Sequence, residues 1–380
     1  MSPGPRILIV AGEDSGDFHG ANLARELHRQ LPGAVIDGVG GQRMAAAGVS
    51  LLFPASRLAV VGLTEVIGRL PAIAAGRRRI LSYLDKEHPD VVVLIDFPDF
   101  NLNLIAPQVK KRRLPLVYYI SPQLWAWRPG RAAKIKALVD RMLVILPFEK
   151  EFYRRRGVEV TYVGHPLVDS FVDYRPLPRS QRPYFALLPG SRDKEVSRLL
   201  PAMAATARQL RRRRPELEFI LPLAPSLDQE LVLSLLPADL RPAVKLVREP
   251  LAACLRQAFF AVVSSGTATL ETALAEVPMV VVYRLGKLTF LAGRLLVSVP
   301  HISLVNLIAG REVVPELLQD DVCAERIVPL VEAVVGNERH YAEVVGELRR
   351  VKELLGGPGA TARAAAEVAA CLEAAKREEK

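Results

Sequence analysis

Two segments in the second half of the sequence combine glycine with hydroxyl and cationic side chains. The first, LLPGSRDKE, places Gly190, Ser191 and Arg192 between a predicted strand and a predicted helix. Backbone N–H groups, a hydroxyl and a guanidinium then meet at one helix N-terminus, which is a combination that suits a phosphate group. The alternative is a surface ion pair between Arg192 and Glu195, one turn further along the helix.

The second segment, SSGTATLE, repeats this arrangement. A predicted helix opens with Ser264, Ser265, Gly266 and Thr267, and Glu271 follows one turn later. The carboxylate of Glu271 could accept hydrogen bonds from the two hydroxyls of a ribose, so the second half is predicted to bind a nucleoside diphosphate. The alternative is an ordinary capping box, although Thr267 and Glu271 are one residue too far apart for it.

The first half of the sequence places acidic side chains after its aliphatic runs. AGEDSGD contains Glu13, Asp14 and Asp17, and IDFPDFN contains Asp96 and Asp99. These carboxylates would repel a diphosphate, so the first half is better suited to an acceptor. Asp14 and Asp17 can instead cap a helix, and Asp99 is placed as an N-cap, so Glu13 and Asp96 are the stronger functional candidates.

The same kind of element positions both sets of loops, namely a short aliphatic run followed by a helical pattern. Such runs include RILIVAG (6–12) and DVVVLID (90–96) in the first half, and YFALLPGS (184–191) and FFAVVSSG (259–266) in the second. Runs that are apolar throughout and separated by helices are typical of a parallel sheet covered on both faces. The sequence therefore predicts an α/β fold with two doubly wound, Rossmann-like domains, whose ligands bind at the carboxyl ends of the strands.

A segment rich in proline and arginine breaks this alternation between the two halves. We therefore predict an acceptor-binding domain over 1–168, a linker over 169–183, a nucleotide-binding domain over 184–345 and a helical tail over 346–380.

The composition favours an anionic partner. The formal net charge of the 380 residues is +10. A nucleic-acid groove would interleave aromatic residues with the basic ones, but aromatic residues make up only 6% of the chain and are almost absent from its arginine clusters. We therefore expect a phosphorylated substrate or an anionic membrane surface, and no nucleic acid.

The spacing of cysteine and histidine predicts no metal site. Cys254, Cys323 and Cys371 lie far apart, without a C-x-x-C pair, and no D-x-D motif or His/Asp cluster stands beside the phosphate loops. The chain also lacks the apolar region of a signal peptide and any run of about 18 apolar residues that could span a bilayer. The sequence thus predicts a cytoplasmic protein that is soluble or peripheral on a membrane.

Residues 58–81 have the pattern of a membrane-surface helix. Apolar side chains, including Val66, Ile67, Leu70 and Ile73, precede a basic border at Arg77 to Arg79. An ordinary core helix is the alternative.

Two tryptophans follow another strand of the first half. Trp125 and Trp127 are candidates to line the acceptor site, although buried aromatic residues more often pack in a core.

Ten motifs occur in an order that resembles one enzyme family: AGEDSGD, GVGGQRM, IDFPDFN, SPQLWAWR, LPFEKEFY, VGHPLVD, LLPGSRDKEV, SSGTATLE, PMVVVYR and NLIAGRE. Over about residues 6–335 the sequence resembles the lipid A disaccharide synthases of Gram-negative bacteria. The resemblance implies a GT-B architecture, with two Rossmann-like domains facing a central cleft and a C-terminal helix that crosses back to the first. It also implies an inverting glycosyltransferase without an organic cofactor.

The reaction implied by the resemblance transfers 2,3-diacylglucosamine from UDP to 2,3-diacylglucosamine 1-phosphate (lipid X), at the cytoplasmic face of the inner membrane. Asp96 matches the proposed general base and Glu13 a required acid, while Arg192 and Asn306 match residues that serve the donor. Which of the two acids accepts the proton stays open, as does a homodimeric assembly. Val305 stands where proline is usual in the family.

Two other functions fit part of the sequence. A UDP-N-acetylglucosamine 2-epimerase would share the two-domain architecture and the nucleotide half, but it would not need the apolar surface of residues 58–81. A basic nucleic-acid-binding protein would explain the net charge, but it would leave the acidic loops without a role.

Overall fold

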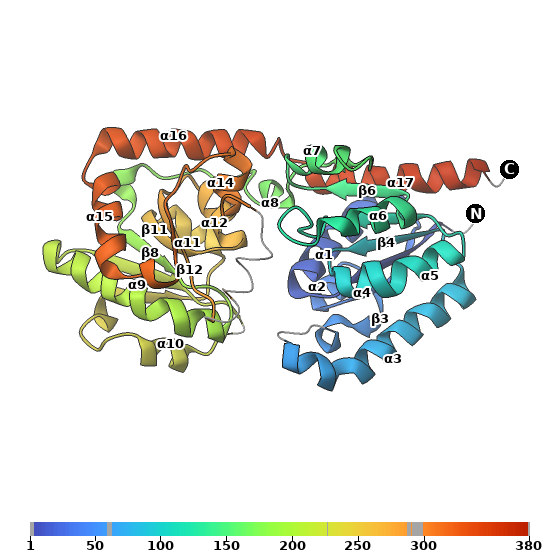
Figure 1. Cartoon of the computed structure of the whole chain (residues 1–380), viewed down its shortest axis with the longest axis horizontal. Coiled ribbons are helices and arrows are strands. Elements are labelled where there is room, and N and C mark those ends of the chain that lie inside the picture. The colour runs from blue at the N-terminus through green and yellow to red at the C-terminus, as the bar shows by residue number, and fades with distance from the viewer. Residues whose placement is uncertain (1–3, 59–62, 226, 287–289, 291–298, 379–380) are drawn as a thin grey trace. The chain divides into compact units, whose positions relative to one another are not determined.

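The computed structural model describes residues 4–58, 63–225, 227–286, 290 and 299–378. The chain divides into two compact units, here called unit 1 (Met1–Asp169 and Gly357–Lys380) and unit 2 (Ser170–Gly356). Each unit is built on one parallel β-sheet with helices packed on it (Figure 1), which confirms the predicted α/β class.

The sheet of unit 1 has seven strands in the order β3-β2-β1-β4-β5-β6-β7, and all neighbours are parallel. The strand bounds are β1 Arg6–Ala11, β2 Val35–Gly40, β3 Ser50–Pro54, β4 Val91–Ile95, β5 Leu116–Tyr119, β6 Arg141–Val144 and β7 Thr161–Tyr162. The described helices are α1 Asp14–Gln30, α2 Gln42–Ala46, η1 Ala55–Arg57, α3 Leu63–Glu87, α4 Pro98–Phe100, η2 Asn101–Ile105, α5 Ala106–Lys111, η3 Pro129–Arg131, α6 Ala132–Leu138, α7 Glu149–Arg154, α8 Pro166–Asp169 and α17 Ala360–Glu378.

Unit 2 has a six-stranded sheet in the order β10-β9-β8-β11-β12-β13, again with parallel neighbours. Its strands are β8 Tyr184–Leu188, β9 Glu218–Pro222, β10 Val244–Val247, β11 Ala258–Ser264, β12 Met279–Tyr283 and β13 Glu316–Leu318. Its described helices are η4 Arg179–Gln181, α9 Asp193–Arg213, α10 Gln229–Leu235, η5 Arg241–Ala243, α11 Leu251–Arg256, α12 Thr267–Leu274, α14 Leu304–Ala309, η6 Gln319–Asp321, α15 Ala324–Val335 and α16 Glu338–Leu354.

Strand β4 shows why the central strands form. All five residues of its VVVLI sequence are buried, and β-branched side chains suit a pleated surface that is covered on both faces. The polar residues begin only after Ile95, where the strand ends. The strand β4 is therefore apolar throughout, and the polar residues are confined to the loop that follows it.

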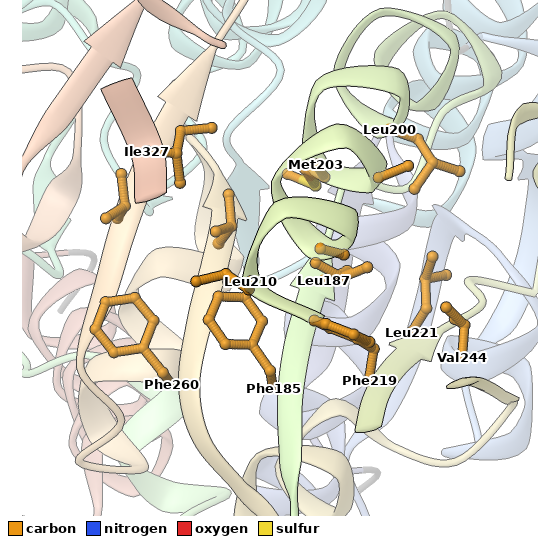
Figure 2. Packing of buried hydrophobic residues seen from close by; sticks show 14 of the residues in the cluster. Phe185, Leu187, Leu200, Met203, Leu210, Phe219, Leu221, Val244, Phe260 and Ile327 are labelled. Atoms are coloured by element: carbon orange, nitrogen blue, oxygen red, sulfur yellow. The ribbon is translucent and has the colours of Figure 1, made fainter. Parts of the chain in front are cut away.

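One hydrophobic core cluster of unit 2 lies between its sheet and helices that include α9 (Figure 2). Phe185 of β8 stacks on Phe260 of β11 with ring centroids 5.5 Å apart, and Phe219 of β9 meets Phe185 edge-on at 5.7 Å. The buried face of α9 covers these rings with side chains at helical spacing, among them Met203 and Leu210. Each such fully buried side chain contributes about 1.5–3 kcal/mol to stability.

The helix α17 completes unit 1, although it is the last described element of the chain. It packs beside α1, and both helices contact β4 (Figure 1). Asp169 caps α17, since one carboxylate oxygen accepts hydrogen bonds from the N–H groups of Gly359 (2.6 Å) and Ala360 (3.1 Å). The other oxygen accepts from the N–H and the hydroxyl of Thr361, both at 3.0 Å.

Residues 170–183 of the expected linker belong to unit 2, as do residues 346–356 of the expected tail, whereas the tail from Gly357 onward belongs to unit 1. Arg179 donates to the main-chain oxygen of Val335 at 2.6 Å within that unit. The boundary expected after residue 345 falls inside α16, which packs on α12, α14 and α15. An ion pair of 2.8 Å between Arg349 and the buried carboxylate of Glu276 helps to hold α16 there.

Candidate functional site

The strand order of unit 1 reverses at β1, which has β2 on one side and β4 on the other. Ala11 pairs with Ile95 at the carboxyl ends of β1 and β4, so the loops that carry Glu13 and Asp96 leave the sheet side by side. Such a switch point is the usual ligand site of an open parallel sheet. The two acids singled out from the sequence therefore come together.

The backbone of Asp96 is held in an unusual conformation. Asp96 and Phe97 have φ angles of 44° and 51°, a left-handed region that residues with a side chain seldom adopt and that is common at functional sites. The main-chain oxygen of Asp96 accepts hydrogen bonds from the hydroxyl of Tyr118 (2.6 Å) and the amide of Asn101 (2.9 Å). These two hydrogen bonds hold the main chain of Asp96 in place and do not involve its carboxylate.

Asn101 also connects the two strands of the switch point. Its amide nitrogen lies 3.3 Å from the main-chain oxygen of Val10 and 3.1 Å from that of Ile95, and the residue is fully buried. Sequence reasoning assigned no role to Asn101 or Tyr118. The sequence shows only that an amide follows the candidate carboxylate in the IDFPDFN motif, whereas its burial depends on the fold.

The environment of Asp96 suits a general base. Burial and, to a smaller extent, the negative charge of Glu13 together raise the pKa of Asp96 to about 7, although the N–H of Phe97 opposes the shift. Glu13 itself is exposed at the N-cap position of α1, where its side chain makes no capping hydrogen bond. A carboxylate with a pKa near 7 can accept a proton efficiently at neutral pH.

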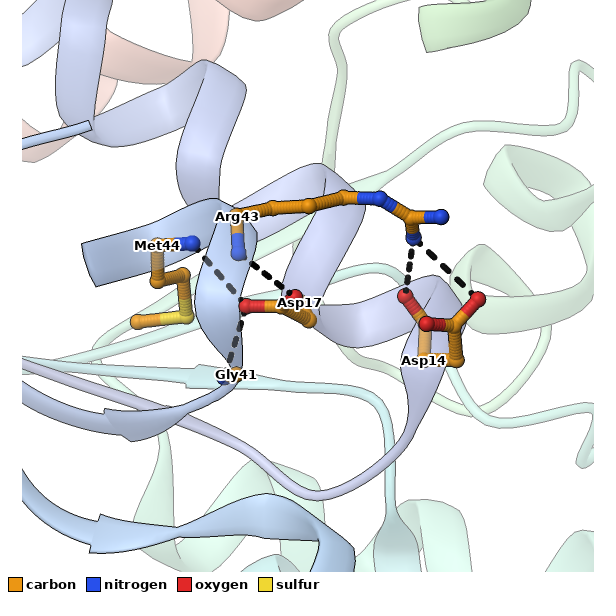
Figure 3. Close-up of polar contacts among 5 residues, drawn as sticks. All are labelled: Asp14, Asp17, Gly41, Arg43 and Met44. Atoms are coloured by element: carbon orange, nitrogen blue, oxygen red, sulfur yellow. Dashed lines mark hydrogen bonds and ion pairs between the residues drawn. The ribbon is translucent and has the colours of Figure 1, made fainter. Parts of the chain in front are cut away.

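The neighbouring acids of the first loop have structural contacts (Figure 3). Asp17 is buried, and its carboxylate accepts hydrogen bonds from the N–H groups of Gly41 (2.7 Å), Met44 (3.0 Å) and Arg43 (3.1 Å). It therefore caps α2 rather than the helix that contains it. Asp14 is exposed and forms an ion pair of 3.1 Å with Arg43.

The expectation that Asp99 caps its helix is wrong. The N-cap position of α4 is Phe97, and Asp99 lies inside the first turn. Its exposed carboxylate pairs instead with Arg131 at 2.5 Å and with Arg128 at 3.8 Å.

Trp125 is half-buried and held by a buried acid. Its indole N–H lies 3.3 Å from a carboxylate oxygen of Glu149, and its ring meets that of Phe148 edge-on at 5.0 Å. Glu149 is 1% exposed and also accepts from the N–H groups of Ile145 (3.2 Å) and Leu146 (2.9 Å). Burial raises the pKa of Glu149 to about 7. Glu149 was not singled out as a functional residue from the sequence.

Unit 2 repeats the switch-point geometry at β8, which lies between β9 and β11. Leu188 pairs with Val263 near the carboxyl ends of β8 and β11, so the two predicted phosphate loops are neighbours. Gly190 and Gly266 have φ angles of 112° and 153°, which glycine alone adopts readily. The N-cap residues of α9 and α12, Arg192 and Gly266, make no side-chain capping hydrogen bond, so the capping-box alternative is not seen.

The polar side chains of this second site have different contacts. The hydroxyl of Ser265 donates to the main-chain oxygen of Ile302 at 2.9 Å, while Gly266 and Thr267 are exposed. Burial raises the pKa of Glu271 to about 7. Within the described residues, the carboxylate of Glu271 has no hydrogen bond or ion pair, so it is available to a polar ligand.

The ion pair considered as an alternative for Arg192 is present. Its guanidinium lies 3.1 Å from one carboxylate oxygen of Glu195, and the other oxygen accepts a hydrogen bond of 3.3 Å from the N–H of Ser191. The Arg192 side chain is 62% exposed, and pairs this exposed contribute under about 1 kcal/mol. A diphosphate could therefore replace the carboxylate at little cost.

The side chain of Asn306, which was expected to serve the UDP-sugar, makes its hydrogen bonds within unit 2. It is fully buried, and its amide nitrogen donates to Val314 and Glu316, both at 2.8 Å. Its amide oxygen accepts from the N–H groups of Val313 (2.7 Å) and Val314 (3.0 Å). All four hydrogen-bonding positions of the amide are occupied.

The expected membrane surface is described only in part. Leu70 on α3 is 53% exposed, whereas Ile73 packs against the core of unit 1. The side chains of Val66 and Ile67 lie outside the described part of the structure. Among the helices that the structure describes, none combines the length and apolar character required to cross a bilayer.

A family model described as lipid-A-disaccharide synthetase matches residues 7–367 of the chain. The chain belongs to the lipid-A-disaccharide synthetase family. The lipid-A-disaccharide synthase of Syntrophus aciditrophicus (strain SB) is 45% identical over 367 residues, covering 94% of this chain and 96% of the relative. The lipid-A-disaccharide synthase of Myxococcus xanthus (strain DK1622) is 44% identical over 378 residues, covering 97% and 98%. The chain is thus an enzyme, a glycosyltransferase of the lipid-A-disaccharide synthetase family.

Solved structures bear out the GT-B fold of this lipid-A-disaccharide synthetase family member. The glycotransferase of kitacinnamycin has a TM-score of 0.63 at 17% identity, covering 98% of this chain and 100% of the other. The calicheamicin glycosyltransferase CalG4 has a TM-score of 0.64 at 19% identity, covering 98% and 99%. The UDP-GlcNAc 2-epimerase from Neisseria meningitidis, bound to UDP-GlcNAc, has a TM-score of 0.66 at 11% identity, covering 96% and 99%. The epimerase shares the fold, but the sequence match to synthases does not favour that alternative.

Proposed function

We propose that this enzyme transfers 2,3-diacylglucosamine from UDP-2,3-diacylglucosamine to lipid X with inversion, giving the disaccharide 1-phosphate and UDP. The observation that carries the proposal is Asp96, a carboxyl group with a pKa of about 7 at the switch point of unit 1. The family supports the reaction class, and the second switch point has the residue types that bind a nucleoside diphosphate.

In the proposed reaction, Asp96 accepts the proton of the acceptor's 6-hydroxyl while that oxygen attacks the anomeric carbon. A bond forms between the oxygen and the anomeric carbon, and the bond from this carbon to the diphosphate oxygen breaks. The electron pair leaves with UDP. Attack from the side opposite the leaving group inverts the configuration at the anomeric carbon.

The residues of unit 2 hold the leaving group. The N-termini of α9 and α12, whose N-cap residues make no side-chain capping hydrogen bond, and the guanidinium of Arg192 stabilise the negative charge that grows on the diphosphate. The carboxylate of Glu271 accepts hydrogen bonds from the ribose hydroxyls. Ser191, Ser265, Gly266 and Thr267 shape the loops around the diphosphate.

We also propose that the enzyme acts at the cytoplasmic face of the inner membrane of a Gram-negative bacterium, as a peripheral protein. The exposed Leu70, the basic residues Arg78 and Arg79 on the same helix and the net charge of +10 support contact with anionic lipid. Flotation with anionic liposomes tests this, and we expect binding that falls with salt. Absence of binding to anionic vesicles would reject it. Assembly as a homodimer is a separate proposal that sedimentation would test.

The deciding experiment incubates the enzyme with UDP-2,3-diacylglucosamine and lipid X, and omits each substrate in turn. We expect a disaccharide 1-phosphate by mass spectrometry, with equimolar UDP, only when both are present. Release of UDP without lipid X, or conversion of UDP-N-acetylglucosamine to its 2-epimer, would contradict the proposal.

A further inference from the structure

We infer that Glu316 is a positioning residue for the nucleotide loop of unit 2, and that it acts through Ile302 and Ser303. This inference rests on the proposed function, because it gives the loop that carries Ser265 the role of binding UDP. Glu316 begins β13, at the edge of the sheet next to β12. It is only partly exposed, and within the described residues its carboxylate accepts from main-chain N–H groups, a hydroxyl and an amide rather than from an arginine or lysine.

The carboxylate of Glu316 accepts hydrogen bonds from four donors within residues 302–306. One oxygen accepts a hydrogen bond of 2.8 Å from the N–H of Ile302. The other accepts from the N–H of Ser303 (3.0 Å), the hydroxyl of Ser303 (2.7 Å) and the amide of Asn306 (2.8 Å). Residues 301–303 belong to no helix or strand, so these N–H groups have no ladder to satisfy them, and Glu316 supplies the missing acceptors.

The peptide segment held in this way reaches the nucleotide loop directly. The main-chain oxygen of Ile302 accepts the hydroxyl hydrogen bond of Ser265 at 2.9 Å. The N–H of Ser265 donates to the main-chain oxygen of Val282 at 3.0 Å. Ser265 is thus fixed on both sides immediately before Gly266, the N-cap of α12. The path from Glu316 to this helix N-terminus consists of Ile302 and Ser265.

Asn306 restrains the orientation of the Glu316 side chain. The amide of Asn306 is fully buried and uses its remaining capacity on Val313 and Val314, so one of its hydrogens is committed to Glu316. Ser303 adds a second restraint, since its hydroxyl donates to Glu316 while accepting from the N–H of Asn306 at 3.2 Å. The carboxylate is therefore orientated before any nucleotide binds.

The test compares Glu316→Gln with wild type in UDP binding, by calorimetry, and in steady-state kinetics. A glutamine turns one acceptor oxygen into a donor that faces N–H groups, so the 302–303 segment loses its anchor. We expect UDP to bind about tenfold more weakly or worse, with a raised KM for the donor and an unchanged KM for lipid X. Glu312→Gln, an exposed glutamate four residues earlier, is the matched control and should bind UDP like wild type.

Ser265→Ala separates positioning from general stability. It breaks the link between Ile302 and the loop while leaving the four contacts of Glu316 in place. We expect both single variants to weaken UDP binding and the double variant to weaken it no further than the stronger single one, because both interrupt the same path. A lower Tm for Glu316→Gln with wild-type UDP affinity would overturn the inference, as would additive losses in the double variant. A wild-type enzyme that binds no UDP would instead overturn the proposed function, and this inference with it.

Discussion

Asp96 and Glu13 follow neighbouring strands of unit 1, and burial together with the negative charge of Glu13 raises the pKa of Asp96 to about 7. The two acids therefore have different physical situations, since Asp96 is half-buried and Glu13 is exposed. Asp96 is suited to accept a proton, whereas Glu13 is suited to set the pH at which Asp96 can do so.

The pH dependence of the reaction should report Asp96. A base acts only when ionised, so kcat/KM should rise with pH through an apparent pKa of about 7 and level off above it. Asp96→Asn should keep the fold and lose about 10²-fold to 10⁴-fold in turnover. Asp99→Asn, on the same loop but exposed and paired with Arg131, is the control and should stay active. A rising limb that persists unchanged in Asp96→Asn would remove Asp96 from this role.

Glu13→Gln should shift the rising limb of the pH–rate profile rather than remove it. Without the negative charge of Glu13, the pKa of Asp96 falls, and the rise in kcat/KM should move to lower pH. The measurement is a pH–rate profile of the variant against wild type and against Asp14→Asn, whose side chain is the adjacent exposed acid. Loss of all activity at every pH would show instead that Glu13 acts directly on the acceptor.

Arg192→Ala should weaken UDP binding. Hydrogen bonds to a charged phosphate contribute about 1.5–3 kcal/mol, so the Kd for UDP should rise by about 10-fold to 100-fold. Arg212→Ala, at the far end of the same helix and exposed, should bind UDP like wild type. Glu195→Gln tests the competing ion pair, and it should tighten binding because a carboxylate near the diphosphate is removed. Equal affinities for Arg192→Ala and wild type by calorimetry would count against the site.

Glu149 should make stability fall as pH rises. Its pKa is about 7 in the folded state against an ordinary 4.5, so the folded protein holds this proton more tightly than the unfolded chain. The contribution to the free energy of unfolding is then greatest below pH 4.5 and declines up to pH 7, by roughly 3 kcal/mol. Denaturant unfolding of Glu149→Gln should lack this part of the slope, which Glu151→Gln, partly exposed on the same helix, should retain. Equal slopes in wild type and Glu149→Gln would contradict the prediction.

Asp17→Ala should destabilise unit 1. Three N–H groups at the start of α2 lose their acceptor, and a lost cap with unsatisfied donors costs about 2–4 kcal/mol. Chemical denaturation should show this, while Asp14→Ala, which loses only an exposed ion pair, should cost less than about 1 kcal/mol. Equal stabilities of the two variants would rule out the capping role.

The sequence predicted the central strands and the loops that follow them, because a strand covered on both faces has to be apolar throughout. β4 and β11 are the clearest cases, since all their residues are buried. The edge strands β3 and β13 were not predicted, because their apolar runs, Leu51 to Phe53 and Leu317 to Leu318, are too short to stand out. The strand order could not be predicted either, since it depends on which strands meet in three dimensions. The proximity of Glu13 to Asp96 follows from the strand order, so it could not be predicted from the sequence.

The candidate sites were predicted unevenly for a similar reason. Residues at the carboxyl ends of strands, such as Asp96 and Arg192, can be read from the sequence. Asn101, Glu149 and Glu316 act by satisfying main-chain groups far away in the sequence. A sequence shows that such a residue is polar, but it does not show which donors or acceptors will surround it.

The cap that Asp169 provides for α17 has a consequence for biosynthesis. Unit 2 is one continuous stretch of chain, whereas unit 1 needs helix α17 beside α1. The half that is translated first is therefore finished last, because its closing helix leaves the ribosome only after the whole of the other half. Until then the nascent first half carries an uncovered apolar flank, which a chaperone is suited to shield.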